Sequence, residues 1–201
     1  DWSESRGLGD VYKRQEYGGI GGDFRFNVIV IEELAKIGAS GPGFAVHSDI
    51  VAPYLINYSS DSQKKEYLPK MVKGEIITAI AMTEPGTGSD LQNIKTKATV
   101  KENNIILNGS KTFITNGQNA NLVLVVAKTD STKKAKGISI VLCEDYRKGF
   151  EKGKNLKKIG MQAQDTSELF FHDVELPIEN ILGQSGQGFG QLMDELPQER
   201  L

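Results

Sequence analysis

A glycine-rich loop directly after an apolar run is the first place where this sequence suggests chemistry. The segment AMTEPGTGSD (residues 81–90) follows EIITAIAM, a run that indicates a buried strand. Its Pro, Gly, Ser and Asp residues turn the chain and leave backbone amides and short hydroxyls uncovered. It is not a P-loop, because it lacks Gly-Lys-Ser/Thr and is followed by another strand-like run, IKTKATV. We interpret it as a loop that lets a flat heterocycle with polar edges approach the main chain.

The segment ELPQERL, residues 195–201, carries two carboxylates near the end of the sequence. Glu195 and Glu199 are four residues apart, about one helical turn, so a continuous helix places them on one face. Pro197 lies between them and is expected to disturb that turn. A carboxylate in an apolar pocket has a raised pKa, because desolvation disfavours its charged form. The alternative is a solvated helix carboxylate beside Arg200.

Composition excludes several function classes. The chain has 201 residues and a net charge of −2, enough length for one or two domains with a sizeable core. Its 24 Lys and Arg residues are scattered, which argues against a nucleic-acid-binding face, and no apolar run is long enough to span a membrane.

The single cysteine, Cys143, lies in an apolar run and is expected to be buried. We predict no metal site, since the two histidines, His47 and His172, are far apart.

Hydrophobic periodicity divides the chain into helices, then strands, then a helix. Residues 24–38, 43–60 and 60–75 have helical patterns, the second interrupted by Pro53. From residue 76 onward, short runs rich in β-branched and aromatic residues alternate with turns, which indicates a barrel or sandwich. The segregated order predicts an α+β protein. The apolar face of the first helix is formed by Val28, Ile31, Leu34, Ala35 and Ile37.

Five segments together resemble one protein family. AMTEPGTGSD resembles the signature of acyl-CoA dehydrogenases, FAD enzymes that oxidise acyl-CoA thioesters. The likeness extends from Glu16 to Leu201, and one departure is Asn93, where the family signature usually has a small residue. Four further segments resemble family blocks and stand in family order: EYGGIGGD, ILNGSKTFITNG, KKIGMQAQDTSELFFHDVELP and LGQSGQGFGQLM.

The resemblance implies a helical N-terminal domain (residues 16–78), a middle β-barrel domain (79–183) and the first helix of a helical C-terminal domain (184–201). It also implies that the first helices and most of the C-terminal domain lie outside this sequence. Residues 1–15 end in GLGDVYKRQ, which resembles adaptor read-through, and we interpret them as a non-native segment.

The implied cofactor is FAD. In the family, backbone groups around Met82 and Thr83 meet the pyrimidine edge of the flavin, and Thr115 matches a threonine that reaches flavin N5. Phe113 stands where many relatives have tryptophan; a core role is the alternative. We predict that Glu84, Pro85 and Asp90 are turn and cap residues. The implied cofactor-contacting residues are Ile80, Ala81, Met82, Thr83, Gly88, Ser89, Phe113, Ile114 and Thr115.

The implied catalytic base is Glu199. The long-chain and isovaleryl branches of the family carry the base on the helix that begins near Gly188, immediately before an arginine, and ELPQERL is particularly similar to the long-chain branch. Where those branches have a substrate-contacting tyrosine, this chain has Gly190, so their chain-length preference is not transferred. The implied substrate-binding residues are Ser89, Ala135, Lys136, Gly190, Pro197, Gln198 and Arg200.

The implied reaction is α,β-dehydrogenation of an acyl-CoA to a trans-2-enoyl-CoA in fatty-acid β-oxidation. Electrons would pass to an electron-transfer flavoprotein, and the full-length protein would be a homotetramer in the bacterial cytoplasm or the mitochondrial matrix. Two alternatives stay open: an acyl-CoA oxidase or related flavin monooxygenase on the same scaffold, and a non-catalytic flavin- or CoA-binding module. We expect this chain alone to bind FAD weakly, because the family holds the adenosine end partly through the C-terminal domain of a neighbouring subunit.

Overall fold

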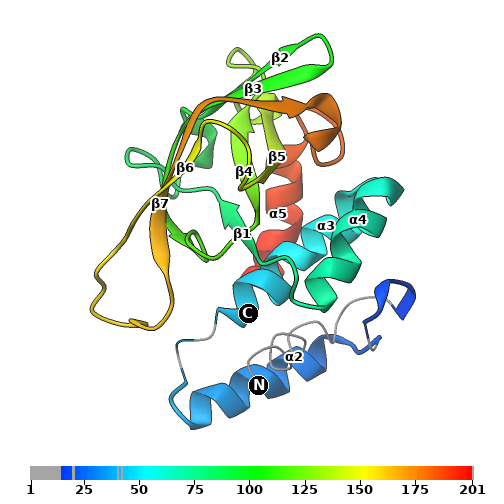
Figure 1. Cartoon of the computed structure of the whole chain (residues 1–201), viewed down its shortest axis with the longest axis vertical. Helices are drawn as coiled ribbons and strands as arrows, with labels where there is room; N and C mark the ends of the chain where they lie inside the picture. The colour runs from blue at the N-terminus through cyan, green and yellow to red at the C-terminus, as the bar shows by residue number, and fades with distance from the viewer. Residues whose placement is uncertain (1–14, 20, 40, 42, 201) are drawn as a thin grey trace.

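The computed structural model describes residues 15–19, 21–39, 41 and 43–200. Residues 1–14, which make up nearly all of the segment interpreted as non-native, lie outside the described residues. Helices come first, then seven strands, then the final helix α5 (Gly188–Glu199) (Figure 1). This order confirms the α+β prediction. Within the described ranges, no helix combines the length and the apolar character that crossing a bilayer requires.

The N-terminal helices begin where the sequence places its caps. Asp23 accepts a hydrogen bond from the backbone N–H of Arg25, and Ser60 forms a capping box with Gln63. Pro53 does not break the helical run, because the π-helical segment Val46–Val51 lies directly before it and a wider turn leaves room for the proline ring. The elements are η2 (Gln15–Tyr17), α2 (Phe24–Lys36), η3 (Val46–Val51), α3 (Ala52–Tyr58) and α4 (Asp61–Val72).

The apolar face expected on α2 is not buried. Val28, Ile31 and Ile37 are 40%, 46% and 76% exposed, and the buried residue of this helix is Asn27. The Asn27 amide donates a hydrogen bond to Asp49 of η3. The hydrophobic periodicity predicted the helix correctly but not its buried face. The face of α2 that carries Asn27 is the one that contacts η3.

The middle of the chain forms one curled sheet of seven strands. The order is β1-β4-β2-β3-β7-β6, and β5 pairs with β4. β1 runs parallel to β4, whereas β2 with β3, β3 with β7, β6 with β7 and β4 with β5 are antiparallel. The strands are β1 (Thr78–Ala81), β2 (Lys97–Lys101), β3 (Asn104–Thr115), β4 (Leu122–Lys128), β5 (Ile138–Glu144), β6 (Phe150–Asn155) and β7 (Thr166–Pro177).

Strand β4 is buried on both faces. Val123 and Val125 belong to the core inside the curl, whereas Leu122 and Leu124 belong to a second core shared with Leu55 of α3. Burial on both sides explains why NLVLVVA is continuously apolar instead of alternating. The helices and the sheet are therefore joined by a common set of side chains. Figure 1 shows the ribbons of α3 and α4 next to α5.

Cys143 on β5 is fully buried, which confirms the prediction from its apolar surroundings. Burial raises the pKa of the Cys143 thiol to about 12, and the neighbouring Glu144 carboxylate adds to the shift. Because the thiolate is the reactive form, we expect iodoacetamide to leave the native protein unlabelled and to alkylate it after unfolding in guanidinium, as measured by intact mass. Rapid labelling of the native protein would show that this strand opens at little cost.

Candidate functional site

The loop after β1 is fixed by its own backbone. Glu84 and Thr87 exchange two main-chain hydrogen bonds, at 2.9 and 3.1 Å, which close a tight turn. Gly88 and Ser89 follow the turn and are exposed. A Cβ placed on Gly88 would meet no atom within 4 Å. The outer side of the loop is therefore open, as expected for a segment that receives a ligand.

A buried ion pair lies under this loop. The Glu84 carboxylate accepts hydrogen bonds from Lys111 Nζ at 2.9 Å and from the backbone N–H groups of Lys95 and Thr96 at 2.6 and 2.9 Å. The Lys111 and Glu84 side chains are 0% and 5% exposed. Burial raises the pKa of Glu84, but the Lys111 charge and the hydrogen bonds outweigh it and the net shift is downward. Burial lowers the pKa of Lys111 to about 8, against the opposing effect of Glu84.

Glu84 is a turn residue, as predicted, but its carboxylate also has distant partners. It binds a lysine 27 residues further along the chain and two backbone amides of the segment before β2. A signal was present in the sequence: Lys111 is a charged residue inside a long strand-like run, and such a residue needs a partner when it is buried.

Strand β3 anchors the carbonyl groups of the expected flavin-contacting backbone. Lys111 Nζ donates to the Met82 carbonyl at 3.0 Å, and the Thr112 N–H donates to the Thr83 carbonyl at 2.9 Å. In a trans peptide the N–H points opposite to the C=O. The N–H of Thr83 therefore points away from Lys111, so the ion pair also orients this amide.

Phe113 lies at a bulge in β3. The register with β7 shifts between Lys111 and Ile114, and Phe113 has φ 59°, a conformation that non-glycine residues adopt at a cost. Its side chain is 67% exposed, while Lys111, Thr112 and Ile114 are buried. The core alternative for Phe113 is therefore wrong. A strained residue that presents an aromatic ring to solvent is typical of a ligand site.

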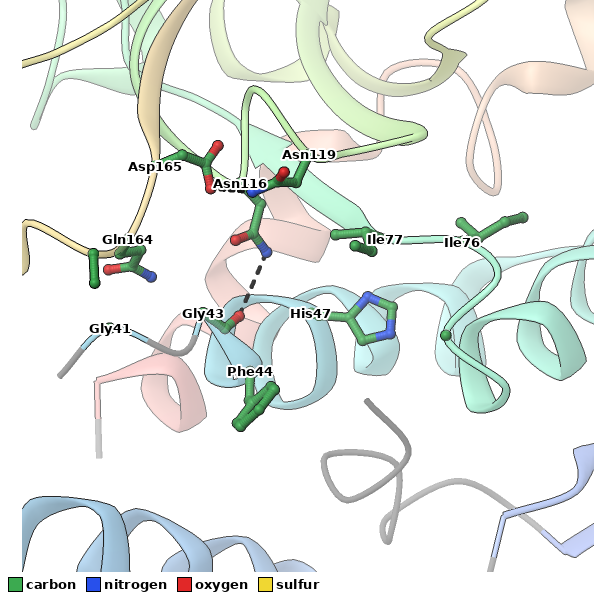
Figure 2. A pocket seen from close by; sticks show the side chains of 12 residues that line it. Gly41, Gly43, Phe44, His47, Ile76, Ile77, Asn116, Asn119, Gln164 and Asp165 are labelled. Carbon is green, nitrogen blue, oxygen red and sulfur yellow. Dashed lines mark hydrogen bonds between the residues drawn. The ribbon is translucent and has the colours of Figure 1, made fainter. Parts of the chain in front are cut away.

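Beyond Thr115, the chain borders a pocket of about 360 Å³. Figure 2 shows Asn116 reaching from the end of β3 toward Gly43, with His47 below and Asp165 above. Asn116 donates to the carbonyl groups of Gly43 and Thr78 at 3.4 and 3.1 Å. The sequence analysis did not identify this pocket, because its walls come from segments more than 100 residues apart, and only the turn-forming Asn116 was a signal.

His47 lies at the edge of that pocket and contacts the start of β1. The backbone N–H of Thr78 donates to His47 Nδ1 at 3.1 Å, and the Thr78 hydroxyl lies 2.9 Å from the same atom. His47 thereby ties η3 to the start of β1.

Glu199 lies half-buried near the end of α5, against α3. Its carboxylate accepts a hydrogen bond from the Tyr54 hydroxyl at 2.7 Å. Burial raises the pKa of Glu199; Tyr54 and Arg200 lower it, and Glu195 raises it further, with a net upward shift. This is the environment required of a carboxylate that accepts a proton near neutral pH.

The expected disturbance at Pro197 does not occur, because α5 stays helical to Glu199. Glu195 and Glu199 consequently face the same side, and Glu195 accepts a hydrogen bond from Asn57 of α3 at 2.7 Å. Gln198 is half-buried, whereas Pro197 and Arg200 are exposed. Glu199 is not a fully solvated carboxylate, since it is half-buried and accepts the hydrogen bond from Tyr54.

Three of the expected substrate-binding residues line a second pocket, of about 330 Å³. Ala135 and Lys136 come from η5 (Lys134–Gly137), and Gly190 comes from α5. Tyr58 and Asp194 complete the wall on the helical side. Ser89 does not line this pocket, but η4 (Leu91–Asn93), just after it, packs beside η5. The glycine-rich loop and the expected CoA-contacting loop are therefore neighbours.

Gly137 allows the chain to close the loop that carries Ala135 and Lys136. A Cβ at this position would lie 1.8 Å from the carbonyl oxygen of Asp130. We expect Gly137→Ala to lower the free energy of unfolding by about 1–3 kcal/mol, as measured by urea denaturation. Gly160→Ala is the matched control, since a Cβ there meets no atom within 4 Å. Equal stability of the two variants would contradict the close approach.

Comparison with known proteins assigns this architecture. The model of the acyl-CoA dehydrogenase N-terminal domain matches residues 3–75, and the model of the acyl-CoA dehydrogenase middle domain matches residues 79–174. The chain belongs to the acyl-CoA dehydrogenase family. The first match begins inside residues 1–15, whose interpretation as a non-native segment stays a prediction.

Known acyl-CoA dehydrogenases resemble the chain over almost all of its length. The mitochondrial long-chain specific acyl-CoA dehydrogenase of Sus scrofa is 52% identical over 198 residues, which are 98% of this chain and 46% of that protein. The mitochondrial isovaleryl-CoA dehydrogenase of Pongo abelii is 40% identical over 205 residues, 100% of this chain and 48% of that protein. An acyl-CoA dehydrogenase structure from Geobacillus kaustophilus is 47% identical, with a TM-score of 0.95 over 99% of this chain and 53% of that one.

The chain spans about half the length of the acyl-CoA dehydrogenases it matches. Within it, the expected flavin segments lie side by side, since β3 contacts Met82 and Thr83 directly. Ala81 and Ile114 belong to the core inside the curl, and Ile80 packs on the helix-facing core. Ala81 and Ile114 are buried, so they can reach a ligand only through their backbone, whereas Ile80 is partly exposed.

Proposed function

We propose that this chain is the N-terminal and middle part of an FAD-dependent acyl-CoA dehydrogenase that converts an acyl-CoA to a trans-2-enoyl-CoA. The observation that carries the proposal is the Glu199 carboxylate, half-buried, with a raised pKa and bound by an uncharged donor, on the helix that follows the flavin-contacting domain. A non-catalytic module has no need of a desolvated carboxylate at this position.

Glu199 is the proposed base for the α-proton of the thioester. An α-proton of a thioester is weakly acidic, so the base must be poorly solvated and its pKa raised. Burial supplies that shift, and the Tyr54 hydroxyl keeps the carboxylate in a defined position without a compensating positive charge. Arg200, the nearest cation that lowers its pKa, is exposed and weakened by solvent.

The residues of the β1 loop and β3 fit a flavin. Phe113 offers an exposed aromatic ring, Thr115 is half-buried at the strand end, and the amide between Met82 and Thr83 is held by β3. A bound FAD would supply the acceptor for the hydride that leaves the β-carbon. The chain's part is to offer fixed donors to the flavin edge, where negative charge develops, and an aromatic surface for its ring.

The proposed site for the CoA thioester lies between η5 and α5. Lys136 and Ala135 come from η5 and Gly190 comes from α5. Ser89 lies on the neighbouring glycine-rich loop. The other proposed contacts lie at the end of α5 and are Pro197, Gln198 and Arg200. Glycine at position 190 leaves its surroundings open, since a Cβ placed there would meet no atom within 4 Å. The full-length enzyme is proposed to form a homotetramer and to pass electrons to an electron-transfer flavoprotein.

Anaerobic reduction tests this function. The full-length protein that contains this chain is purified with FAD and mixed with saturated acyl-CoAs of graded chain length, and the visible absorbance of the flavin is followed. We expect bleaching with at least one chain length and an enoyl-CoA product by mass spectrometry. A protein that binds FAD and is bleached by none of them would overturn the proposed dehydrogenation. Rapid reoxidation by air would assign it instead to the oxidases.

A further inference from the structure

The facing sides of α3 and α5 carry a set of polar contacts that the expected catalytic residues do not account for. Tyr54 donates to Glu199 at 2.7 Å, Asn57 donates to Glu195 at 2.7 Å, and the Tyr58 hydroxyl lies 3.4 Å from Asp194. The order of these contacts shows that the two helices are antiparallel. In each contact, a neutral donor on α3 faces a carboxylate on α5.

We propose that Tyr54 is a positioning residue that holds the Glu199 carboxylate through a neutral hydrogen bond, and that the buried Glu195 opposes the charge of Glu199. This inference rests on the proposed function, since it gives Glu199 the role of base. Neither Tyr54 nor Glu195 needs to touch the substrate for this effect.

The choice of a tyrosine has a physical consequence. A lysine or arginine at this position would stabilise the charged carboxylate strongly and make it a poor base. The Tyr54 side chain is fully buried. Burial raises the pKa of its hydroxyl well above the usual range, and the Glu199 carboxylate raises it further. The hydroxyl therefore keeps its proton and remains a donor at every pH at which the enzyme would work.

Glu195 acts in the opposite direction. Only 8% of its surface is exposed, and it lies one helical turn before Glu199. A second carboxylate one turn away disfavours the charged form of Glu199, and the Glu195 charge raises the pKa of Glu199 accordingly. The Asn57 amide stabilises Glu195 in place without cancelling its charge.

The other titratable groups lie on the same two helices and on η3, η5 and β5, which pack against α5. They are Tyr58 on α3, Asp194 on α5, Arg200 directly after it, His47 and Asp49 on η3, Lys134 and Lys136 on η5, and Cys143 and Glu144 on β5. Of these, Arg200 acts on Glu199 and lowers its pKa. Removing the Tyr54 hydroxyl and removing the Glu195 charge should therefore move the protonation of Glu199 in opposite directions.

The test measures proton abstraction without turnover. A 3-thiaacyl-CoA has acidic α-protons but sulfur at the β position, so Glu199 can take a proton while no hydride can leave. Its deprotonated form beside oxidised flavin gives a new long-wavelength absorbance, and the midpoint pH of that change is recorded for the full-length, FAD-loaded protein. We expect Tyr54→Phe to raise the midpoint by about one pH unit and Glu195→Gln to lower it by about 0.5–1 unit.

Tyr67→Phe is the matched control. Tyr67 is also a buried tyrosine that donates to a carboxylate, Glu144, at 3.0 Å, but it lies on α4 away from Glu199. It should lose a comparable hydrogen bond and leave the midpoint unchanged. If Tyr54→Phe fails to fold, as judged by its melting temperature, Glu195→Gln alone decides: a lower midpoint supports the inference, and an unchanged one overturns it.

Failure of the inference differs from failure of the proposed function. If the wild type responds to the analogue and Glu199→Gln does not, while Tyr54→Phe and Glu195→Gln keep the wild-type midpoint or shift it in the same direction, the inference alone is overturned. If the wild type neither responds to the analogue nor is bleached by any acyl-CoA, the proposed function is overturned and the inference with it.

Discussion

Replacing Glu199 by glutamine should abolish flavin bleaching by acyl-CoA in the full-length enzyme while leaving ligand binding intact. Glutamine keeps the size of the side chain and an oxygen that accepts the Tyr54 hydrogen bond, but it cannot take a proton. A positioned general base typically contributes about 10²–10⁴-fold to a rate. We therefore expect the anaerobic reduction rate to fall by at least about 10²-fold, as measured by stopped-flow absorbance.

Glu66→Gln on α4 is the control for this substitution, because the Glu66 side chain is largely exposed and lies outside the proposed site. It should reduce at the wild-type rate. If Glu199→Gln is bleached as fast as the wild type, the base lies in another part of the full-length protein. Membership of the acyl-CoA dehydrogenase family would be unaffected, since it rests on residues 3–75 and 79–174.

The sign of the stability change separates a base from a structural residue. A carboxyl group whose folded-state pKa is raised binds its proton more tightly in the folded state, so its contribution to stability is lost as pH rises through that pKa. Burial raises the pKa of Glu199. Near neutral pH, Glu199→Gln should therefore unfold at the same temperature as the wild type or a higher one, although it is inactive. A lower melting temperature would indicate a structural role.

Replacing Lys111 by methionine should destabilise the protein by about 3–5 kcal/mol, because it leaves Glu84 as a buried charge without its cation. The Glu84 side chain is 5% exposed, and the two backbone amides that remain do not replace the charge of Lys111. Urea denaturation of this chain, or of the full-length protein, measures the loss.

The double variant Lys111→Met with Glu84→Gln is the matched control. Glutamine keeps an oxygen for the N–H groups of Lys95 and Thr96 and removes the unpaired charge. We expect the double variant to recover a large part of the lost stability, which no independent pair of substitutions would do. Equal losses in the single and double variants would contradict a buried ion pair. In either variant the Met82 carbonyl loses its Lys111 donor, so flavin affinity should fall in both.

The sequence predicted the elements well and the non-local contacts poorly. The caps at Asp23 and Ser60 and the continuous apolar run of β4 have local physical causes. The Glu84–Lys111 pair joins positions 27 residues apart and the Tyr54–Glu199 pair joins positions 145 apart. No periodicity specifies either pair, because each depends on how the completed elements pack.

Phe113 shows the same limit at one residue. The sequence left both a core position and a ligand-facing position open for Phe113. The bulge between Lys111 and Ile114 exposes its side chain. A bulge shifts the inward and outward pattern by one residue. The expectation that Pro197 would disturb α5 was wrong for a related reason, since the contacts of Glu195 and Glu199 with α3 hold the last turn.

Because β4 is buried on both faces, the two matched domains cannot be separated into independently stable parts. Leu122 and Leu124 form one core with Leu55 and Leu68 of the helices. The strand region without the helices would expose those leucines to water. The exposed apolar face of the sheet would then favour aggregation. Hydrogen exchange should therefore report α3, α4 and β4 opening in a single cooperative event. The strands that would hold the flavin and the helices that position Glu199 therefore form one cooperative unfolding unit.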